Sequence, residues 1–145
     1  MTSVAPYLNF PGNCMAAFDF YRSTFRGEFE FLGKFGEMPP GEYPLSEAQK
    51  DLIMHVSLPI GNGSYLLGSD TIEGYGGPMI AGNNFGVSIT ADTREEAKRL
   101  FDGLSAGGKV TMPMDDTFWG SYFGMFTDQF NINWMVSCES KAQKG

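Results

Sequence analysis

The chain has few of the residues from which catalytic and metal sites are usually built. Its 145 residues include one histidine, His55, and two cysteines, Cys14 and Cys138. The cysteines have no metal-type spacing, and no serine–histidine–aspartate or cysteine–histidine combination stands out. Two cysteines are enough for one disulfide, but a chain without a secretion signal is expected in the reducing cytoplasm, where thiols stay free.

Basic residues are also scarce, with 10 Lys and Arg against 17 Asp and Glu and a net charge of −7. Nucleic-acid binding needs clustered Lys and Arg, so we expect no nucleic-acid partner. No apolar run approaches the ~18 residues of a membrane span, so no membrane partner is expected. The N-terminal residues lack a basic segment followed by an apolar one, which excludes an ordinary secretion signal and favours a cytoplasmic location.

Aromatic residues, in contrast, are abundant, since they make up 14% of the chain and include 13 Phe. Apolar residues at 42% and charged residues at 19% are typical of a globular protein. The length suits a single domain, residues 1–145, with a core large enough to take up most of the aromatic side chains.

The sequence repeats itself at about half its length. Ala17 and Ala97 stand 80 residues apart in the same local pattern, as do Tyr21 and Phe101. In each half the pattern predicts a strand, an amphipathic helix and three further strands. We therefore predict an α+β fold of two βαβββ modules, residues 1–70 and 84–145, joined by a glycine-rich linker at 71–83. Curved mixed sheets of the two modules are expected to surround a shared cleft.

The two predicted helices carry recognisable signals. One face of the first helix collects the apolar residues Cys14, Ala17, Phe18, Tyr21 and Phe25. Asn13 is its expected N-cap. In the second helix Thr93 and Glu96 have the spacing of a capping box, and Glu95 and Arg99 are expected to pair.

Residues 36–50 form a Pro/Gly-rich segment within the first module. The segment is long for a structureless loop. We interpret it as a lid over the cleft that carries Met38 and Tyr43, or as a surface loop or a dimer contact.

Alternation along the strands separates an apolar side, which should pack against the helix, from a more polar side. In the third strand, for example, Met54, Val56 and Leu58 should face the helix. The polar sides are expected to line the cleft with Tyr7, Asn9, His55, Ser57, Asn84, Ser88, Asn133 and Met135. A single bulge would reverse this assignment within a strand.

His55 is the one residue of this set that changes charge near neutral pH, so it is the candidate acid or base. The alternative is a strand histidine whose polar atoms are satisfied by its neighbours. Trp119 and Tyr122 flank a glycine-containing strand and are candidates for stacking on a flat ligand, with ordinary core packing as the alternative. Trp134 should face the helix and lie in the core.

These patterns resemble the vicinal oxygen chelate superfamily, which includes glyoxalases, extradiol dioxygenases and fosfomycin- and bleomycin-resistance proteins, and within it the PhnB-like branch. The resemblance is carried by PYLNF at 6–10, GNC at 12–14, AFDFY at 17–21, IMHVSL at 53–58, GSD at 68–70, DTFWG at 116–120 and DQFNINW at 128–134. It implies βαβββ modules that pair within one chain or across a homodimer, with the ligand in the cleft.

Metal-dependent members of this superfamily hold a divalent ion with His, Gln or Glu. The roughly matching positions here are Tyr7, Leu67, Asn84 and Met135, which do not make such a site. We therefore expect no metal and no cofactor.

Three functions stay open. The preferred prediction is a homodimeric, metal-free protein that binds a small organic ligand, as bleomycin-resistance proteins do. The alternative is an enzyme of the same superfamily that acts on a small oxygen-rich substrate, with His55 as acid or base and with Tyr7, Asn9 or Tyr122 orienting the substrate. The third is a protein that mainly offers a surface to a partner.

Overall fold

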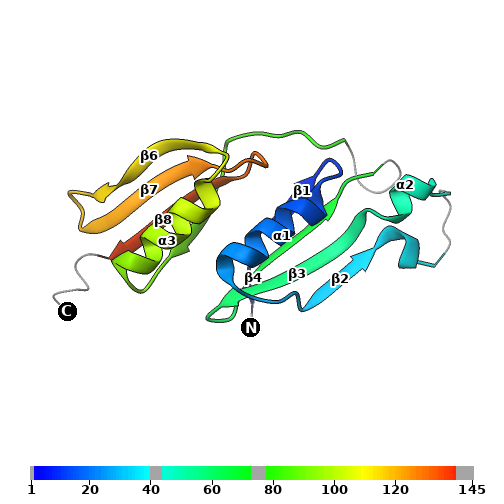
Figure 1. Cartoon of the computed structure of the whole chain (residues 1–145), viewed down its shortest axis with the longest axis horizontal. Coiled ribbons are helices and arrows are strands. Elements are labelled where there is room, and N and C mark those ends of the chain that lie inside the picture. Colours follow the sequence, from blue (N-terminus) through cyan, green and yellow to red (C-terminus); the bar gives the residue numbers. More distant parts are fainter. Residues whose placement is uncertain (1, 40–43, 73–77, 140–145) are drawn as a thin grey trace. The chain divides into compact units, whose positions relative to one another are not determined.

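Each half of the chain folds into a four-stranded mixed sheet with a 12-residue helix packed on one face (Figure 1). The computed structural model describes residues 2–39, 44–72 and 78–139, and it divides into two units, Met1–Ile80 and Ala81–Gly145. The predicted α+β fold of two βαβββ modules is confirmed. No helix in the described ranges is long and apolar enough to cross a bilayer.

The first unit has the sheet order β1-β4-β3-β2, in which β1 and β4 are parallel and the other pairs are antiparallel. Its main elements are β1 (Tyr7–Phe10), α1 (Cys14–Phe25), β2 (Phe31–Lys34), β3 (Ile53–Gly61) and β4 (Ser64–Asp70). Between β2 and β3 lie the short helices η1 (Phe35–Glu37) and α2 (Glu47–Lys50). The segment expected as a loop is therefore partly helical. Met38 is half-buried, and Tyr43 lies outside the described residues, so the lid stays a prediction.

The second unit has the matching order β5-β8-β7-β6, again with its first pair parallel. Its elements are β5 (Val87–Thr90), α3 (Arg94–Ser105), β6 (Lys109–Asp116), β7 (Ser121–Thr127) and β8 (Asn133–Glu139).

The 80-residue repeat holds for the helices but not for the strands. Cys14 and Arg94, the first residues of α1 and α3, stand 80 residues apart. The same shift maps Tyr7, which is 44% exposed, onto Val87, which is 8% exposed. Alternation within each strand, rather than the repeat, therefore identifies which side chains face away from the helix.

The start of α1 is held by a residue that is distant in the sequence. The side chain of Asn13, the expected N-cap, makes no capping hydrogen bond. The backbone N–H of Cys14 donates instead to Oδ1 of Asp70 at 2.9 Å, and the N–H of Ile53 donates to Oδ2 at 2.9 Å. Asp70 is 3% exposed. One buried carboxylate thus joins the beginnings of α1 and β3 to the end of β4.

The second unit uses local contacts instead. Oγ1 of Thr93 accepts the backbone N–H of Glu96 at 3.0 Å, as the capping-box spacing predicts. The expected pair of Glu95 with Arg99 is wrong. Arg99 pairs with the next residue, Glu96, and its Nη2 lies 2.7 Å from Oε2 of Glu96.

The turn between β7 and β8 is organised by a second buried carboxylate, that of Asp128. Its Oδ1 accepts the N–H groups of Phe130 and Ile132, and its Oδ2 accepts the indole N–H of Trp134 at 2.8 Å. Trp134 is 1% exposed, which confirms its predicted place in the core.

A register shift in the first sheet changes one predicted contact. Gly33 pairs with His55, but Lys34 pairs with Ile53, so β3 bulges at Met54. Ile53 is consequently the buried residue, at 1% exposure, whereas Met54 is half-buried. The expectation that Met54 packs in the core is wrong for this reason, and His55 keeps its predicted side.

Each sheet also has a glycine beneath an aromatic ring of its helix. A Cβ added at Gly68 would lie 2.6 Å from Cε1 of Phe18 and 2.8 Å from the carbonyl oxygen of Leu8. At Gly124 an added Cβ would lie 2.7 Å from Cε2 of Phe101. The missing side chains let the helices approach their sheets closely.

We expect Asp70→Ala to lower the free energy of unfolding by about 3 kcal/mol, because two buried N–H groups lose their acceptor. Urea denaturation measures this change. The control is Asp51→Ala, an exposed position in the same unit, for which a change within about 0.5 kcal/mol is expected. Equal effects of the two substitutions would contradict the role given to Asp70.

Gly68→Ala should also destabilise the protein, by about 1–3 kcal/mol, since the added methyl group overlaps Phe18. Thermal unfolding is the suitable measurement. Gly82→Ala is the matched control, because its added Cβ would meet only Oδ1 of Asn84 at 4.0 Å. A wild-type melting temperature for Gly68→Ala would show that the close helix packing is not needed.

Candidate functional site

The face of the first sheet opposite α1 gathers four of the residues expected to bind a ligand. We call this surface the N-terminal open face, and its residues are Tyr7, Asn9, Phe31, His55, Ser57, Tyr65, Leu67 and Ser69. The strand register sets Tyr7 beside Leu67, Leu67 beside Ser57 and Ser57 beside Phe31. Alternation along the strands therefore places Tyr7, Asn9, His55 and Ser57 together. Their roles in binding stay a prediction.

His55 is held by aromatic rings from two other strands. The hydroxyl of Tyr7 lies 3.1 Å from Nδ1 of His55, and the two rings stack with centroids 5.6 Å apart at 30°. The ring of Phe31 lies 5.8 Å from the imidazole at 42°. Tyr7 is 44% and Phe31 48% exposed, so both rings also offer apolar surface to a ligand.

The sequence-based selection missed Phe31, although the alternation of the second strand carries the signal. Phe29 and Phe31 stand two residues apart, so alternation would put both on one side of a strand, but β2 begins only at Phe31. Phe29 lies instead beneath the guanidinium of Arg22, 5.6 Å from its ring centroid. The strand boundary decides that only Phe31 reaches His55.

Tyr65 adds a further polar group to the same face. It alternates with Leu67 along β4, and its hydroxyl hydrogen-bonds to the carboxylate of Glu30. This hydrogen bond and the negative charge of Glu30 raise the pKa of the Tyr65 phenol, because ionisation would place two negative charges together.

The corresponding face of the second sheet is rich in thioethers. Met112, Met125, Met135 and Ser88 stand side by side across four strands. Met135 was expected on this face, whereas Met112 and Met125 were missed. Methionine side chains are flexible and polarisable, so this row forms an adaptable apolar surface.

The two asparagines expected to bind a ligand in the second unit differ in their surroundings. The side-chain oxygen of Asn133 accepts from the Thr127 hydroxyl at 2.7 Å, and its amide nitrogen donates to the carbonyl of Gly82 at 3.4 Å. Asn133 therefore serves the local structure. Asn84 is exposed and lies before the first residue of β5, so it does not face a strand partner.

Trp119 and Tyr122 lie in different surroundings, and stacking on a ligand stays a prediction for both. Trp119 is 56% exposed in the turn after β6, and its ring centroid lies 5.8 Å from that of Phe123. Tyr122 pairs with the buried Cys138 on the helix side of the sheet, and the guanidinium of Arg94 lies 4.0 Å from its ring centroid. Arg94 thus lies over one face of the Tyr122 ring.

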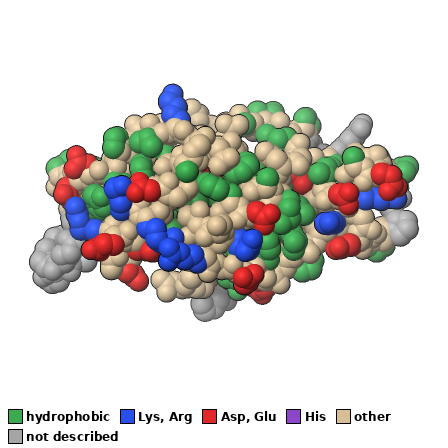
Figure 2. All heavy atoms as spheres, in the orientation of Figure 1, with side chains coloured by type: hydrophobic (Ala, Val, Ile, Leu, Met, Phe, Trp, Pro, Cys, Tyr) green, Lys and Arg blue, Asp and Glu red, His purple; other side chains and the backbone are tan. Residues whose placement is uncertain are grey.

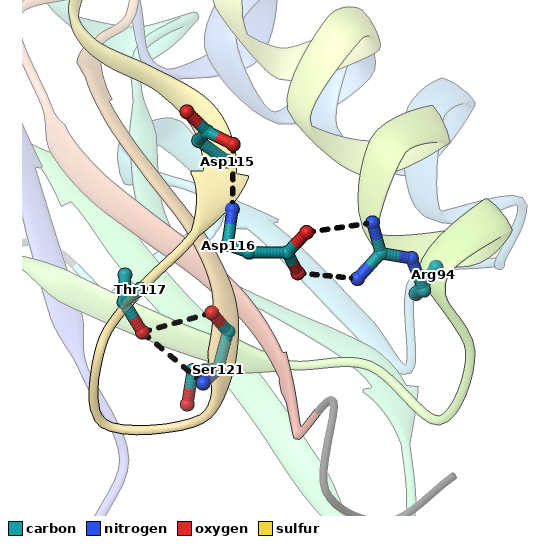
Figure 3. A network of polar contacts seen from close by, with 5 residues as sticks. All are labelled: Arg94, Asp115, Asp116, Thr117 and Ser121. Atoms are coloured by element: carbon teal, nitrogen blue, oxygen red, sulfur yellow. Dashed lines mark hydrogen bonds and ion pairs between the residues drawn. The ribbon is translucent and has the colours of Figure 1, made fainter.

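The polar network around Arg94 is shown in Figure 3. Asp116 accepts from two guanidinium nitrogens of Arg94, at 2.7 and 3.5 Å, and this contact raises the pKa of Arg94. Thr117 and Ser121 close the adjacent turn, because the Thr117 hydroxyl donates to the Ser121 carbonyl at 2.8 Å. Asp116 therefore forms an ion pair that links α3 to β6.

The cysteines are both free and buried within the described residues. Burial raises the pKa of the Cys14 thiol, and the nearby charge of Asp70 raises it further. Cys14 consequently stays a neutral thiol, in keeping with a structural role.

On the surface, acidic side chains lie next to basic ones on the face shown in Figure 2.

Comparison with known proteins gives the family. Residues 5–136 match the family model of the Glyoxalase/Bleomycin resistance protein/Dioxygenase superfamily, so the chain belongs to this superfamily.

Among individual relatives, the chain is 33% identical over 137 residues to Protein YjdN of Escherichia coli, covering 92% of this chain and 93% of YjdN. It is similar to the crystal structure of PA1353 from Pseudomonas aeruginosa, with a TM-score of 0.81, 39% identity and coverage of 96% and 98% of the two chains. The PhnB protein from Bacillus cereus gives a TM-score of 0.73 at 22% identity, over 94% of this chain and 99% of that one, a likeness of fold.

The residues present do not fit the divalent metal that the superfamily implies. Tyr7 and Leu67 are neighbours in the register of β1 and β4. In the second sheet the register neighbour of Met135 is Ser88, so Ser88 stands at the position expected for Asn84. Tyrosine, leucine, methionine and serine lack the imidazole and carboxylate groups that such ions prefer. Within the ranges that the structure describes, no three His, Cys, Asp or Glu side chains come together as ligands.

The raised pKa of Tyr65 can be tested directly. Glu30→Gln removes the neighbouring negative charge, so the Tyr65 pKa should fall toward the ordinary tyrosine value. A pH titration of carbon-13-labelled tyrosine, with the signal assigned through Tyr65→Phe, measures the shift. Glu28→Gln, an exposed change two residues away, should leave the titration unaltered. An unchanged Tyr65 titration in Glu30→Gln would refute the contact.

Proposed function

We propose that this protein binds a small organic molecule without a metal ion, and that the N-terminal open face supplies the principal contacts. The observation that carries the proposal is the group of Tyr7, Phe31 and His55, in which two half-exposed aromatic rings flank a hydrogen-bonded imidazole. Exposed rings give a flat ligand stacking surface, and the imidazole adds one directional polar contact.

Polar side chains near the imidazole support the same proposal. Asn9 and Ser69 are neighbours in the register of β1 and β4, and both alternate onto the open face. They offer hydrogen bonds that would orient a ligand against the rings. The donor set also favours binding without a metal, since the face has a single imidazole and no carboxylate among its own residues.

An enzyme remains the second candidate, and the hydrogen bond between Tyr7 and His55 is the observation that favours it. A tyrosine that orients an imidazole is an arrangement used in acid–base catalysis. The substrate would be small and rich in oxygen, as expected from the sequence. If His55→Ala leaves every detected activity and ligand affinity unchanged, the enzyme proposal fails.

Native mass spectrometry of the purified protein, without added metal, separates these candidates. We expect a homodimer that carries an organic mass and no stoichiometric divalent ion. A stoichiometric divalent ion would contradict the metal-free proposal. Conversion of the bound molecule during incubation would favour the enzyme.

Once the co-purified ligand is identified, Phe31→Ala should weaken its binding by about tenfold, because the aromatic ring that would stack on the ligand is lost. Isothermal titration calorimetry measures the affinity. Leu32→Ala is the matched control: it removes a similarly exposed apolar side chain from the adjacent position on the opposite face of β2. Equal losses for both variants would point to altered stability and not to a binding contact.

A further inference from the structure

The hydrogen bond between Tyr7 and His55 has a direction, and that direction decides what His55 presents to a ligand. The Tyr7 hydroxyl lies 3.1 Å from Nδ1 of His55. In a neutral imidazole one nitrogen carries a proton and donates, while the other accepts. If the hydroxyl donates to Nδ1, the proton of the imidazole must be on Nε2.

Elementary acidity favours this arrangement. A phenol O–H is a far stronger acid, and so a better donor, than the N–H of a neutral imidazole, which makes O–H···N the stable form of the pair. Within the described residues Tyr7 is the one hydrogen-bond partner of the His55 ring. No carboxylate or backbone carbonyl there draws the proton to Nδ1.

The aromatic contacts keep the imidazole in this orientation. The Tyr7 ring stacks on it at 30°, and the Phe31 ring lies against it at 42°. A flip of the imidazole about its χ2 angle would put a carbon in place of Nδ1 and break the hydrogen bond. Nε2, on the side of the ring away from Nδ1, is left for a ligand.

We propose that Tyr7 holds neutral His55 in the tautomer with its proton on Nε2, so that this site selects ligands carrying a hydrogen-bond acceptor. The inference rests on the proposed binding function and gives it a ligand class. That class is a flat molecule with a neutral acceptor atom, such as a carbonyl oxygen or a ring nitrogen.

The charges around the N-terminal open face favour a neutral acceptor over an anionic one. The N-terminal open face contains no Lys or Arg, and Glu30 places a negative charge beside Tyr65. An anionic group would therefore find no counter-charge among the residues of this face. A neutral acceptor avoids this cost and still uses the Nε2 proton.

The same tautomer opposes a role for His55 as a general base but suits a general acid, which would donate the Nε2 proton to a substrate. A base must accept a proton at the nitrogen that meets the substrate, and here that nitrogen already carries one. Tyr7 is accordingly a positioning residue, whose effect on a ligand is exerted through His55.

Nitrogen-15 NMR tests the tautomer without ambiguity, because His55 is the only histidine in the chain. At about pH 8.5, where histidine is neutral, the full-length protein labelled with nitrogen-15 histidine should show a protonated Nε2 and an unprotonated Nδ1. Tyr7→Phe keeps the ring but removes the hydroxyl, so it should shift the Nδ1 signal and release a mixture of tautomers. A protonated Nδ1 in the wild type, or identical spectra for both proteins, overturns the inference.

Three soluble rings of similar size then test the ligand class. Pyridine carries an acceptor, pyrrole a donor, and benzene neither. Pyridine should bind about fivefold more tightly than benzene or pyrrole, the effect of one net hydrogen bond, and should alone move the Nε2–H signal. Tyr7→Phe should reduce this preference.

The outcomes separate the two proposals. Equal binding of the three rings overturns the acceptor preference while leaving a binding face in place. Absence of binding by all three, with the expected tautomer observed, overturns the proposed function of this face and the ligand class with it.

Discussion

The buried carboxylate of Asp70 is the contact on which the first unit depends. It lies at the end of β4 and accepts the N–H groups of Cys14 and Ile53, the first residues of α1 and β3. A carboxylate removed from water is costly unless it is hydrogen-bonded, so the two donors and the carboxylate require one another. Three elements that are distant in the sequence are thereby joined at a single side chain.

The positions of the candidate site residues depend on that junction. Ile53 is anchored two residues before His55, and the bulge at Met54 lets Ile53 face the core while His55 faces away from α1. Tyr7 belongs to β1, and β4 lies between β1 and β3 in the sheet. The Tyr7 side chain therefore spans the intervening strand to reach Nδ1 of His55.

The second unit repeats the sheet order but relies on the nearby residues Thr93 and Asp128 for its helix start and its turn.

Periodic patterns predicted much of this structure because they depend on local geometry. The helices begin at Cys14 and Arg94, as the apolar face of the first helix and the capping signal at Thr93 indicated. Tyr7 and Asn9 are exposed as predicted, whereas their neighbours Leu8 and Phe10 are buried. Where the prediction failed, a non-local partner or an irregularity intervened. Asp70 replaced Asn13 as the cap of α1, and one extra residue in β3 exchanged Met54 for Ile53 in the core.

Of the site itself, the sequence predicted which residues share a face and could not predict which of them touch. It indicated Tyr7, Asn9, His55 and Ser57 by parity, but Phe31 emerged only when the beginning of β2 was known. For Tyr122 the sequence did not indicate the contact with Arg94, whose guanidinium lies over one face of the Tyr122 ring.

The sequence by itself determined the family, the two βαβββ modules and the polar side of most strands, because residue periodicity and local capping act over a few positions. Only the tertiary structure decided that Tyr7 and His55, which are 48 positions apart, share a hydrogen bond. Strand order and register bring those side chains together, and the spacing of residues along one strand determines neither of them.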